Sequence, residues 1–387
     1  MINSNRHEFG EFMAPILKSF CKWLCEELVN RNISHVYFMS REGAFLKLVF
    51  DEYLKTNTYN FKISTYHLEV SRRSLSVPSI NCINDIKRLV FERPTRFYTL
   101  SELLKFRFGV DVYSQKDIDL KYLSKKECFN HVEKYAEEIL DNAARERLGL
   151  GRYLHKMLPD SKDQISLVDI GYNGTLQSIL NNSIVDNKVT GFYFSTFSGI
   201  TSKLQANEFK SFYLDCYDNQ SNSCFFSKNI ALFEYFLTLG DASVSRYSEQ
   251  GCPIYMDASE GNSDYKITFQ SCVIDSIASC NEFVGDNGLM FDGLNHSIIN
   301  EMIFGLKGAY IEDLFGGKKR RYIIFESRNP TSVFMNSEWS YGAYEKIKSQ
   351  HGTNFADIYF YLSGLPERIF FFIRKFRRKV YAYIGER

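Results

Sequence analysis

Apolar and polar positions in the first 75 residues follow helix and strand periods in turn. Residues 12–29 carry apolar side chains three and four positions apart, which predicts an amphipathic helix. Residues 33–39 and 63–70 are rich in apolar, aromatic and β-branched side chains and predict two strands, while residues 44–54 between them have helical spacing. A strand, a helix and a second strand in this order indicate a β-α-β unit with parallel pairing and a right-handed crossover.

A long helical stretch follows before the sheet resumes. Residues 84–158 are mostly helical in period, which predicts a helical insertion between strands. Further strands are expected at residues 165–169, 189–196 and 209–214, with a crossover helix starting near Leu176. We therefore expect an α/β fold, with a parallel or mixed Rossmann-like sheet, a large helical insertion and a helical C-terminal region.

The expected domain organisation has three parts. Residues 1–250 would form an α/β catalytic domain that includes the insertion at about 84–158. Residues 251–367 would form a mostly helical C-terminal region, and residues 368–387 a basic amphipathic tail.

Composition narrows the class of protein. Of 387 residues, 44% are hydrophobic, which is enough for a substantial core, and the formal net charge of +1 gives no basic field for nucleic acid. The nine cysteines include no Cys-x-x-Cys and the seven histidines no His-Glu-x-x-His, so we expect reduced thiols and no zinc site. No apolar run approaches the roughly 20 residues that span a bilayer. The first seven residues are polar and lack the core of a signal peptide, and the reduced thiols lead us to expect a cytoplasmic protein.

Polar side chains follow three of the predicted strands. The first group is the turn Ser40-Arg41-Glu42-Gly43, the second is Ser71-Arg72-Arg73, and the third begins at Asp169. The carboxyl ends of parallel strands are where open α/β sheets bind ligands. Arginine side chains suit phosphate oxygens because they make bidentate, charge-assisted contacts. These loops therefore predict a site for an anionic ligand.

The third loop is the most informative. An apolar strand ends in Asp169, two glycines three positions apart follow at Gly171 and Gly174, and a helix is expected from Thr175. A helix N-terminus offers unpaired N–H groups and the positive end of a dipole to an anion. A carboxylate at this position can accept hydrogen bonds from sugar hydroxyls or help to hold a metal ion. A tight turn that binds nothing is the alternative interpretation.

Several enzyme classes do not fit the pattern. Haloacid-dehalogenase phosphatases need a second acid two positions after the first, where this chain has Gly171. The sequence also lacks a Walker Gly-x-x-x-x-Gly-Lys motif and a Gly-x-Ser-x-Gly nucleophile elbow. Asp117 and Asp119 match the Asp-x-Asp of nucleotide-sugar transferases, but capping of a helix at Leu120 is the favoured interpretation.

The loops together resemble a known family. The segments 37–43, 66–73 and 167–177 are similar to bacterial proteins of surface-polysaccharide gene clusters that are often labelled haloacid-dehalogenase-type hydrolases. In two-domain members, a phosphatase domain precedes a glycan-specific phosphoribosyltransferase domain that carries these motifs. That domain transfers ribose 5-phosphate from phosphoribosyl pyrophosphate to a glycan, and the phosphatase then removes the 5-phosphate.

The resemblance covers residues 10–247 and includes no phosphatase domain. A separate phosphatase could then act on the product, the product could keep its phosphate, or another donor could be used. The implied activity is a transfer to a glycan of the O-antigen or capsule, with inversion and release of pyrophosphate.

The resemblance also implies site residues. Asp169 would hold ribose hydroxyls or metal-bound water, and Mg²⁺ is expected with the pyrophosphate. Glu42 and Glu234 are the candidates for the general base that takes the acceptor proton. Arginines of the first two loops would clamp the pyrophosphate, and the third loop would bind a phosphate. The substrate-binding candidates are Arg41, Gly43, Ser71, Arg72, Arg73, Gly171, Asn173, Gly174, Thr175 and Gln177.

The C-terminal tail suggests where the protein acts. Residues 368–387 alternate aromatic and basic side chains at helical spacing, which is typical of a helix at an anionic membrane surface. This would suit an enzyme at the inner face of the cytoplasmic membrane that uses a lipid-linked glycan acceptor. A nucleotide-sugar-dependent glycosyltransferase and a non-catalytic, sugar-phosphate-binding assembly subunit remain alternatives.

Overall fold

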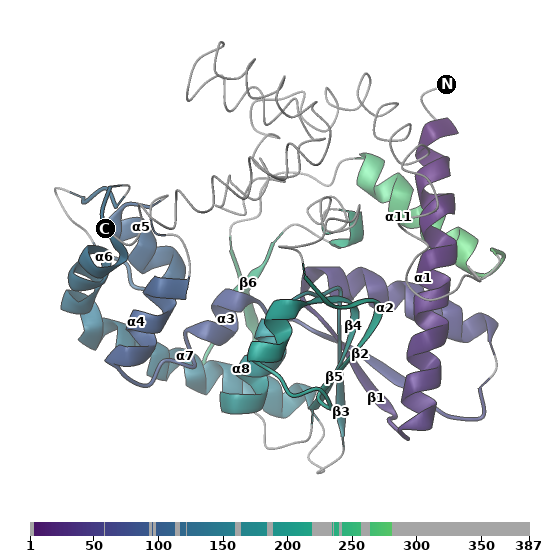
Figure 1. The fold of residues 1–387 in the computed structure, drawn as a ribbon, viewed down its shortest axis with the longest axis horizontal. Helices are drawn as coiled ribbons and strands as arrows, with labels where there is room; N and C mark the ends of the chain where they lie inside the picture. The colour runs from purple at the N-terminus through teal and green to yellow at the C-terminus, as the bar shows by residue number, and fades with distance from the viewer. Residues whose placement is uncertain are drawn as a thin grey trace. The chain divides into compact units, whose positions relative to one another are not determined.

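The larger part of the described structure is built on a five-stranded parallel sheet with strand order β2-β1-β3-β4-β5 (Figure 1). The predicted α/β class with a parallel Rossmann-like sheet is confirmed, and all five strands arise where the hydrophobic pattern places them. Their bounds are β1 (His35–Met39), β2 (Ser64–Leu68), β3 (Ile165–Asp169), β4 (Val189–Phe197) and β5 (Phe209–Tyr217).

This computed structural model describes residues 4–57, 59–92, 95, 98–112, 117–120, 122–158, 164–183, 189–218, 234, 236–239, 242–256 and 264–280. The predicted helical region at 251–367 falls mostly outside these residues, and the predicted tail at 368–387 falls wholly outside them. The described residues belong to two compact units, one containing the sheet and one formed by Cys82–Ile139. The three-part division expected from the sequence stays a prediction.

Helices of the sheet-containing unit cover both faces of the sheet. Phe20 and Trp23 contact Phe194 and Phe192 of β4 on one face. On the other face, a buried apolar cluster joins β1 and β3 to three helices, through Leu75, Leu154 and Leu176. The helices of this unit are α1 (Ser4–Asn30), α2 (Ser40–Thr56), α3 (Arg72–Ser76), α7 (Ala136–Met157), α8 (Thr175–Ser183) and α11 (Asp264–Ile277).

Side-chain alternation along β1 explains this two-sided burial. Phe38 packs on Phe50 of α2, whereas its neighbours Tyr37 and Met39 belong to the cluster on the opposite face. Successive strand residues point to opposite faces, so an entirely apolar strand is stable only when both faces are covered. Every residue of β4 is buried, as expected for an interior strand.

Three local features differ from the sequence prediction. Helix α2 begins at Ser40, so residues expected to form a turn make its first helical turn. Gly43 permits this, because a Cβ atom there would lie 2.7 Å from the carbonyl carbon of Phe38. The pattern also does not predict the short helix α3 or the antiparallel pair β6 (Val244–Tyr247) and β7 (Pro253–Tyr255).

The unit formed by Cys82–Ile139 is helical, in agreement with the helical period of that stretch. Its elements are α4 (Ile83–Glu92), α5 (Leu100–Leu103), a π-helical turn (Leu104–Phe108), α6 (Lys125–Val132) and a 3₁₀ turn (Glu133–Tyr135). Within the described part of the chain, no helix has the length and hydropathy needed to cross a membrane.

Candidate active site

The carboxyl ends of β1, β2 and β3 lie at one edge of the sheet. The strand order reverses at β1, since β2 pairs on one side of it and β3 on the other. Helices that follow β1 and β3 therefore diverge at this point, and open α/β sheets bind ligands there. All three loops predicted from the sequence follow these strands.

Asp169 and Glu42 meet at this edge. Asp169 ends β3 and Glu42 lies in the first turn of α2, and each residue is only 8% exposed. Burial raises the pKa of Asp169 well above its ordinary value, and the negative charge of Glu42 raises it further. Backbone N–H groups of Ile170 and Gly171, together with the charge of Arg72, oppose that rise. The end of β3 therefore holds a buried carboxyl close to a second acid.

Glu234 is the third acid of this group. Burial and the charge of Glu42 raise the pKa of Glu234 to about 7, while Arg72 and Arg41 act in the opposite direction. Because the charge of Glu42 acts on both Asp169 and Glu234, we call Glu42, Asp169 and Glu234 the acid cluster. A carboxyl that titrates near neutral pH can both accept and release a proton under physiological conditions. Among the three residues that the sequence marked as catalytic candidates, Glu42 thus acts electrostatically on both of the others.

Thr238 joins two members of the acid cluster and was not predicted from the sequence. Its hydroxyl donates to Oε1 of Glu42 across 3.0 Å and lies 2.5 Å from the backbone carbonyl oxygen of Glu234. The Nη2 atom of Arg41 lies 3.9 Å from the same Oε1 atom of Glu42. No local pattern identifies Thr238, because its role depends on a contact with a residue 196 positions away.

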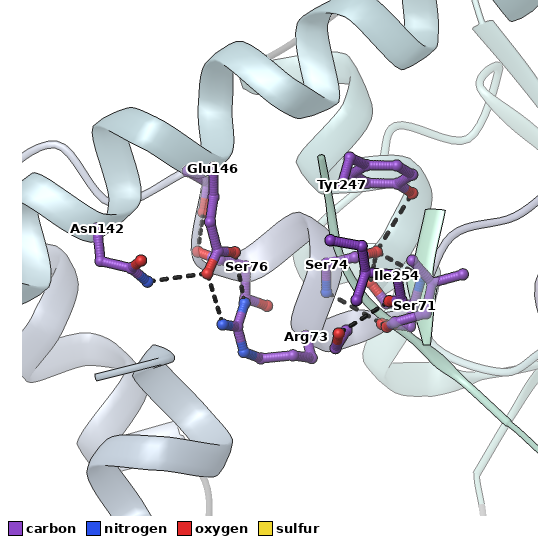
Figure 2. A network of polar contacts seen from close by, with 11 residues as sticks. Ser71, Arg73, Ser74, Ser76, Asn142, Glu146, Tyr247 and Ile254 are labelled. Atoms are coloured by element: carbon purple, nitrogen blue, oxygen red, sulfur yellow. Dashed lines mark hydrogen bonds and ion pairs between the residues drawn. The ribbon is translucent and has the colours of Figure 1, made fainter. Parts of the chain in front are cut away.

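The second loop contributes one arginine rather than two. Arg72 is exposed, and its positive charge acts on both Asp169 and Glu234. Arg73 instead forms a bidentate ion pair with Glu146 (Figure 2). The Ser71 hydroxyl caps α3 and donates to the carbonyl oxygen of Val244. The structure therefore gives no support to Arg73 or the Ser71 side chain as phosphate ligands.

The third loop has a backbone that needs glycine at two positions. Gly171 has φ +148°, and a Cβ atom there would lie 2.3 Å from the carbonyl oxygen of Ser195. Gly174 has φ +58°, which is unfavourable for other residues, and it directly precedes α8. The side chain of Asn173 lies against Gly199, close to where a Cβ atom of that residue would be. Only glycine suits positions 171 and 174, so the spacing of these two glycines in the sequence has a structural cause.

Lys203 adds a positive charge at the start of α8. Its Nζ atom donates to Oγ1 of Thr175 across 2.7 Å, and Thr175 is the first residue of the helix. The ammonium group therefore stands beside backbone N–H groups that have no partner within the helix. Sequence reasoning missed Lys203 because it lies 28 positions from Thr175, in a turn after β4.

Gln177 serves the interior of the protein instead of the site. Its side chain is fully buried, and its Nε2 atom donates to the carbonyl oxygen of Glu208 across 2.8 Å. Its Oε1 atom accepts a hydrogen bond from the Tyr193 hydroxyl across 2.7 Å. Both ends of the amide are therefore engaged within the protein, and a role in substrate binding finds no support.

Tyr172 is part of the site although the sequence assigned it no role. Its ring stacks on Phe197 with centroids 5.0 Å apart and an interplanar angle of 18°. Burial raises the pKa of Tyr172, and the charges of Glu234, Glu42 and Asp169 add to the effect. The phenol is therefore neutral at physiological pH, and the charges of all three members of the acid cluster act on it.

The predicted magnesium ion has two candidate ligands. Within the described ranges, no three His, Cys, Asp or Glu side chains group closely enough to ligate a metal ion. Magnesium that binds together with phosphates needs only one or two protein carboxylates. The charge of Glu42 already disfavours ionisation of Asp169, and a cation would remove this repulsion. These two carboxylates suit a substrate-borne magnesium ion.

The Asp-x-Asp string has a different role from the one expected. Oδ1 of Asp117 accepts hydrogen bonds from the backbone N–H groups of Ser101 and Ile118, at 3.0 and 2.9 Å. Asp119 forms an isolated antiparallel bridge with Thr99, and Leu120 begins no helix. Asp117 therefore caps the first turn of α5 instead of a helix at Leu120.

Comparison with known protein families and with curated proteins yields no match to this chain. The functional interpretation therefore depends on the residues at the carboxyl edge of the sheet.

Proposed function

We propose that this chain is a glycosyltransferase that uses phosphoribosyl pyrophosphate. It would transfer ribose 5-phosphate to a glycan acceptor, with inversion at C1 and release of pyrophosphate, during synthesis of a bacterial O-antigen or capsule. One observation carries the proposal: the acid cluster, with Arg72 and Arg41 beside it, lies where the strand order reverses, next to the loop that opens α8. Such a place can hold a sugar between a base and an anion site.

The proposed reaction is a single displacement. A hydroxyl oxygen of the acceptor forms a bond to C1 of the ribose, and the bond from C1 to the pyrophosphate oxygen breaks. The leaving pyrophosphate keeps the electron pair, and the acceptor proton passes to a carboxylate. Glu234 is the favoured proton acceptor because its pKa of about 7 matches the operating pH of a general base. Glu42, the second candidate, is engaged by the Thr238 hydroxyl.

The arginines would stabilise the leaving group. Negative charge develops on the pyrophosphate as the bond to C1 breaks, and positioned cations lower the energy of that transition state. Arg72 and Arg41 fit this role because their charges act on the acid cluster. Asp169 and Glu42 would hold Mg²⁺ brought in with the pyrophosphate, and the ion would neutralise part of that charge.

The 5-phosphate would bind at the start of α8. Backbone N–H groups after Gly174, the hydroxyl of Thr175 and the ammonium group of Lys203 can all donate to phosphate oxygens. Asp169, at the end of the adjoining strand, would accept hydrogen bonds from the ribose hydroxyls. The sugar would thus lie between the third loop and the acid cluster.

The proposal extends to location and partners. The enzyme would act in the cytoplasm at the inner membrane face, on a lipid-linked glycan, with residues 368–387 as a basic membrane-binding tail. That tail lies outside the described residues. A separate phosphatase would act on the product if the 5-phosphate is removed.

Mass spectrometry provides the test. The full chain would be incubated with phosphoribosyl pyrophosphate, Mg²⁺ and a panel of lipid-like glycan acceptors, and products examined for an added pentose phosphate. If the protein transferred sugar only from nucleotide sugars, its donor would be a nucleotide sugar instead of phosphoribosyl pyrophosphate. Donor binding without turnover on any acceptor would favour an assembly subunit, and absence of donor binding by folded protein would reject the proposal.

A further inference from the structure

Three consecutive residues after β2 interact with three different parts of the protein, two by hydrogen bonds and one through its charge. Ser71 contacts the β6 backbone, Arg73 contacts α7, and Arg72 acts on the acid cluster. Helix α3, which these residues begin, has only five residues, and so short a helix is not stable by itself. Its direction must therefore be set by contacts with neighbouring elements.

Ser71 anchors one side of the helix start. Its Oγ atom accepts from the backbone N–H of Ser74 at 3.0 Å (Figure 2). The same atom donates to the carbonyl oxygen of Val244 at 2.6 Å. The Ser74 hydroxyl lies 2.9 Å from the backbone N of Ser71, completing a reciprocal cap. The cap thus ties the first turn of α3 to β6.

Arg73 anchors the other side. Its two Nη atoms each lie 2.7 Å from an oxygen of Glu146, and the two side chains are only 10% and 4% exposed. Asn142 donates to the same carboxylate across 2.8 Å, so α7 presents a pre-organised acceptor (Figure 2). A buried ion pair adds little net stability because desolvation offsets its attraction. Its planar, two-bond geometry does restrict where the guanidinium can lie.

The segment before α3 is held as well. The Tyr153 hydroxyl accepts from the backbone N of Glu69 at 2.8 Å, and the Tyr247 hydroxyl donates to the Glu69 carbonyl oxygen at 2.6 Å. The two rings stack with centroids 4.5 Å apart and an interplanar angle of 20°. The chain is therefore fixed two residues before Ser71 and again at Arg73.

Successive side chains on a helix point about 100° apart. We propose that the Arg73–Glu146 ion pair is a positioning device that holds the guanidinium of Arg72 beside the acid cluster, where it can bind the pyrophosphate of the donor. Arg73 and Glu146 are then positioning residues, and Arg72 is the one that touches substrate. This inference rests on the proposed function for its ligand, but not for the placement of Arg72.

The test replaces the ion pair with apolar side chains of similar size. Arg73→Met combined with Glu146→Leu removes the pairing without leaving a buried charge, so the fold should survive. Arg72→Gln is the reference variant, and Glu27→Gln with Arg31→Gln is the control, because it removes an ion pair of α1 away from the site. Two readouts apply to each full chain: the NMR titration of Glu234, and the affinity for inorganic pyrophosphate with Mg²⁺.

The expected outcome is that Arg72→Gln and the apolar pair both raise the titration midpoint of Glu234, because the nearby positive charge is lost. Both should also weaken pyrophosphate binding about tenfold or more, while the control matches the wild type. A folded apolar pair that keeps wild-type titration and affinity would overturn the proposal, as would an Arg72→Gln variant with an unchanged titration.

Two further results distinguish failure of the positioning role from failure of the proposed function. If the apolar pair fails to fold, Arg73→Lys retains the charge but not the two-bond geometry, and unchanged titration and affinity in that variant would overturn the proposal. If Glu234 titrates as expected but the wild type binds neither pyrophosphate nor phosphoribosyl pyrophosphate, the positioning role stands and the proposed function fails.

Discussion

The hydroxyl of Thr238 donates a hydrogen bond to the carboxylate of Glu42 across 3.0 Å, although the two residues are 196 positions apart. The same hydroxyl lies 2.5 Å from the carbonyl oxygen of Glu234. One small side chain thereby links the start of α2 to the segment that carries the third acid. We therefore expect the position of the Glu42 carboxylate to depend on Thr238.

Thr238→Val keeps the shape of the side chain and removes its donor. A buried carboxylate oxygen then loses its partner, which should cost about 1–3 kcal/mol of unfolding free energy. Activity should fall in the same variant because Glu42 is no longer held. Urea unfolding and kcat/KM would be measured against Thr238→Ser, which retains the hydroxyl. Equal stability and activity of the two variants would contradict the prediction.

Asp169→Asn should separate activity from stability. The folded-state pKa of Asp169 is raised by burial and by Glu42, so the folded protein binds a proton more readily than the unfolded chain. Its contribution to stability is therefore largest at low pH, and it is lost as pH rises from the ordinary value of about 3.9 through the folded pKa. At pH 8 the variant should melt at the same or a higher temperature, yet lose on the order of 100-fold or more in transfer rate. Full activity would remove Asp169 from the proposed mechanism.

The raised pKa of Glu234 predicts a specific pH dependence of both activity and stability. Its pKa is raised to about 7, against about 4.3 in an unfolded chain, so its contribution to stability declines as pH rises between those values. As a general base it must be ionised, so kcat/KM should rise with pH with a midpoint near 7. Glu234→Gln should abolish this limb of the profile and flatten the stability curve between pH 4 and 7. A profile that keeps the limb would assign it to another group.

Lys203→Met tests the anion site at the start of α8. Loss of a charge-assisted donor should weaken binding of phosphoribosyl pyrophosphate about tenfold, with little change in melting temperature because Lys203 is exposed. Lys210→Met is the matched control, since Lys210 is an exposed lysine of β5. Calorimetry should show weaker binding and a smaller salt dependence for the first variant only. Equal affinity of both variants would place the phosphate elsewhere.

Gly171→Ala should be strongly destabilising. The new Cβ atom would lie 2.3 Å from the carbonyl oxygen of Ser195, in a backbone conformation with φ +148°. We expect a loss of about 3 kcal/mol or more, which is typical of steric conflict at a constrained backbone position. Gly151→Ala is the control, because a Cβ atom at this position of α7 would meet open space. This substitution should stabilise the protein by about 0.5–1 kcal/mol. Urea denaturation of both variants would check the contrast.

Periodicity predicted the strands well because burial on both faces leaves a direct mark on the sequence. Residues 165–169 and 189–196 are rich in apolar, aromatic and β-branched side chains, and both became interior strands. The pattern failed at residues 40–43, where a glycine suggested a turn. That glycine instead allows α2 to approach the β1 backbone, which is a packing requirement rather than a local preference.

Some site residues were likewise identified by a local motif, whereas others could be identified only from contacts between distant parts of the chain. The motif after β3 identified Asp169, Gly171 and Gly174, because strand, acid, glycine and helix follow one another along the chain. Residue type alone could not distinguish Arg72 from Arg73, since both follow the same strand. Only the position of Glu146 on α7 shows that one arginine is engaged in the interior.

By itself, the sequence determined the α/β class, the parallel crossovers and the three loops, because each arises from hydrophobic spacing and local backbone preference. The tertiary structure alone decided the strand order, the engagement of Arg73 and Gln177, and the addition of Thr238 and Lys203 to the site. These features join residues that are distant in the chain, and their energies depend on burial, charge and geometry that exist only after the sheet and its helices have packed.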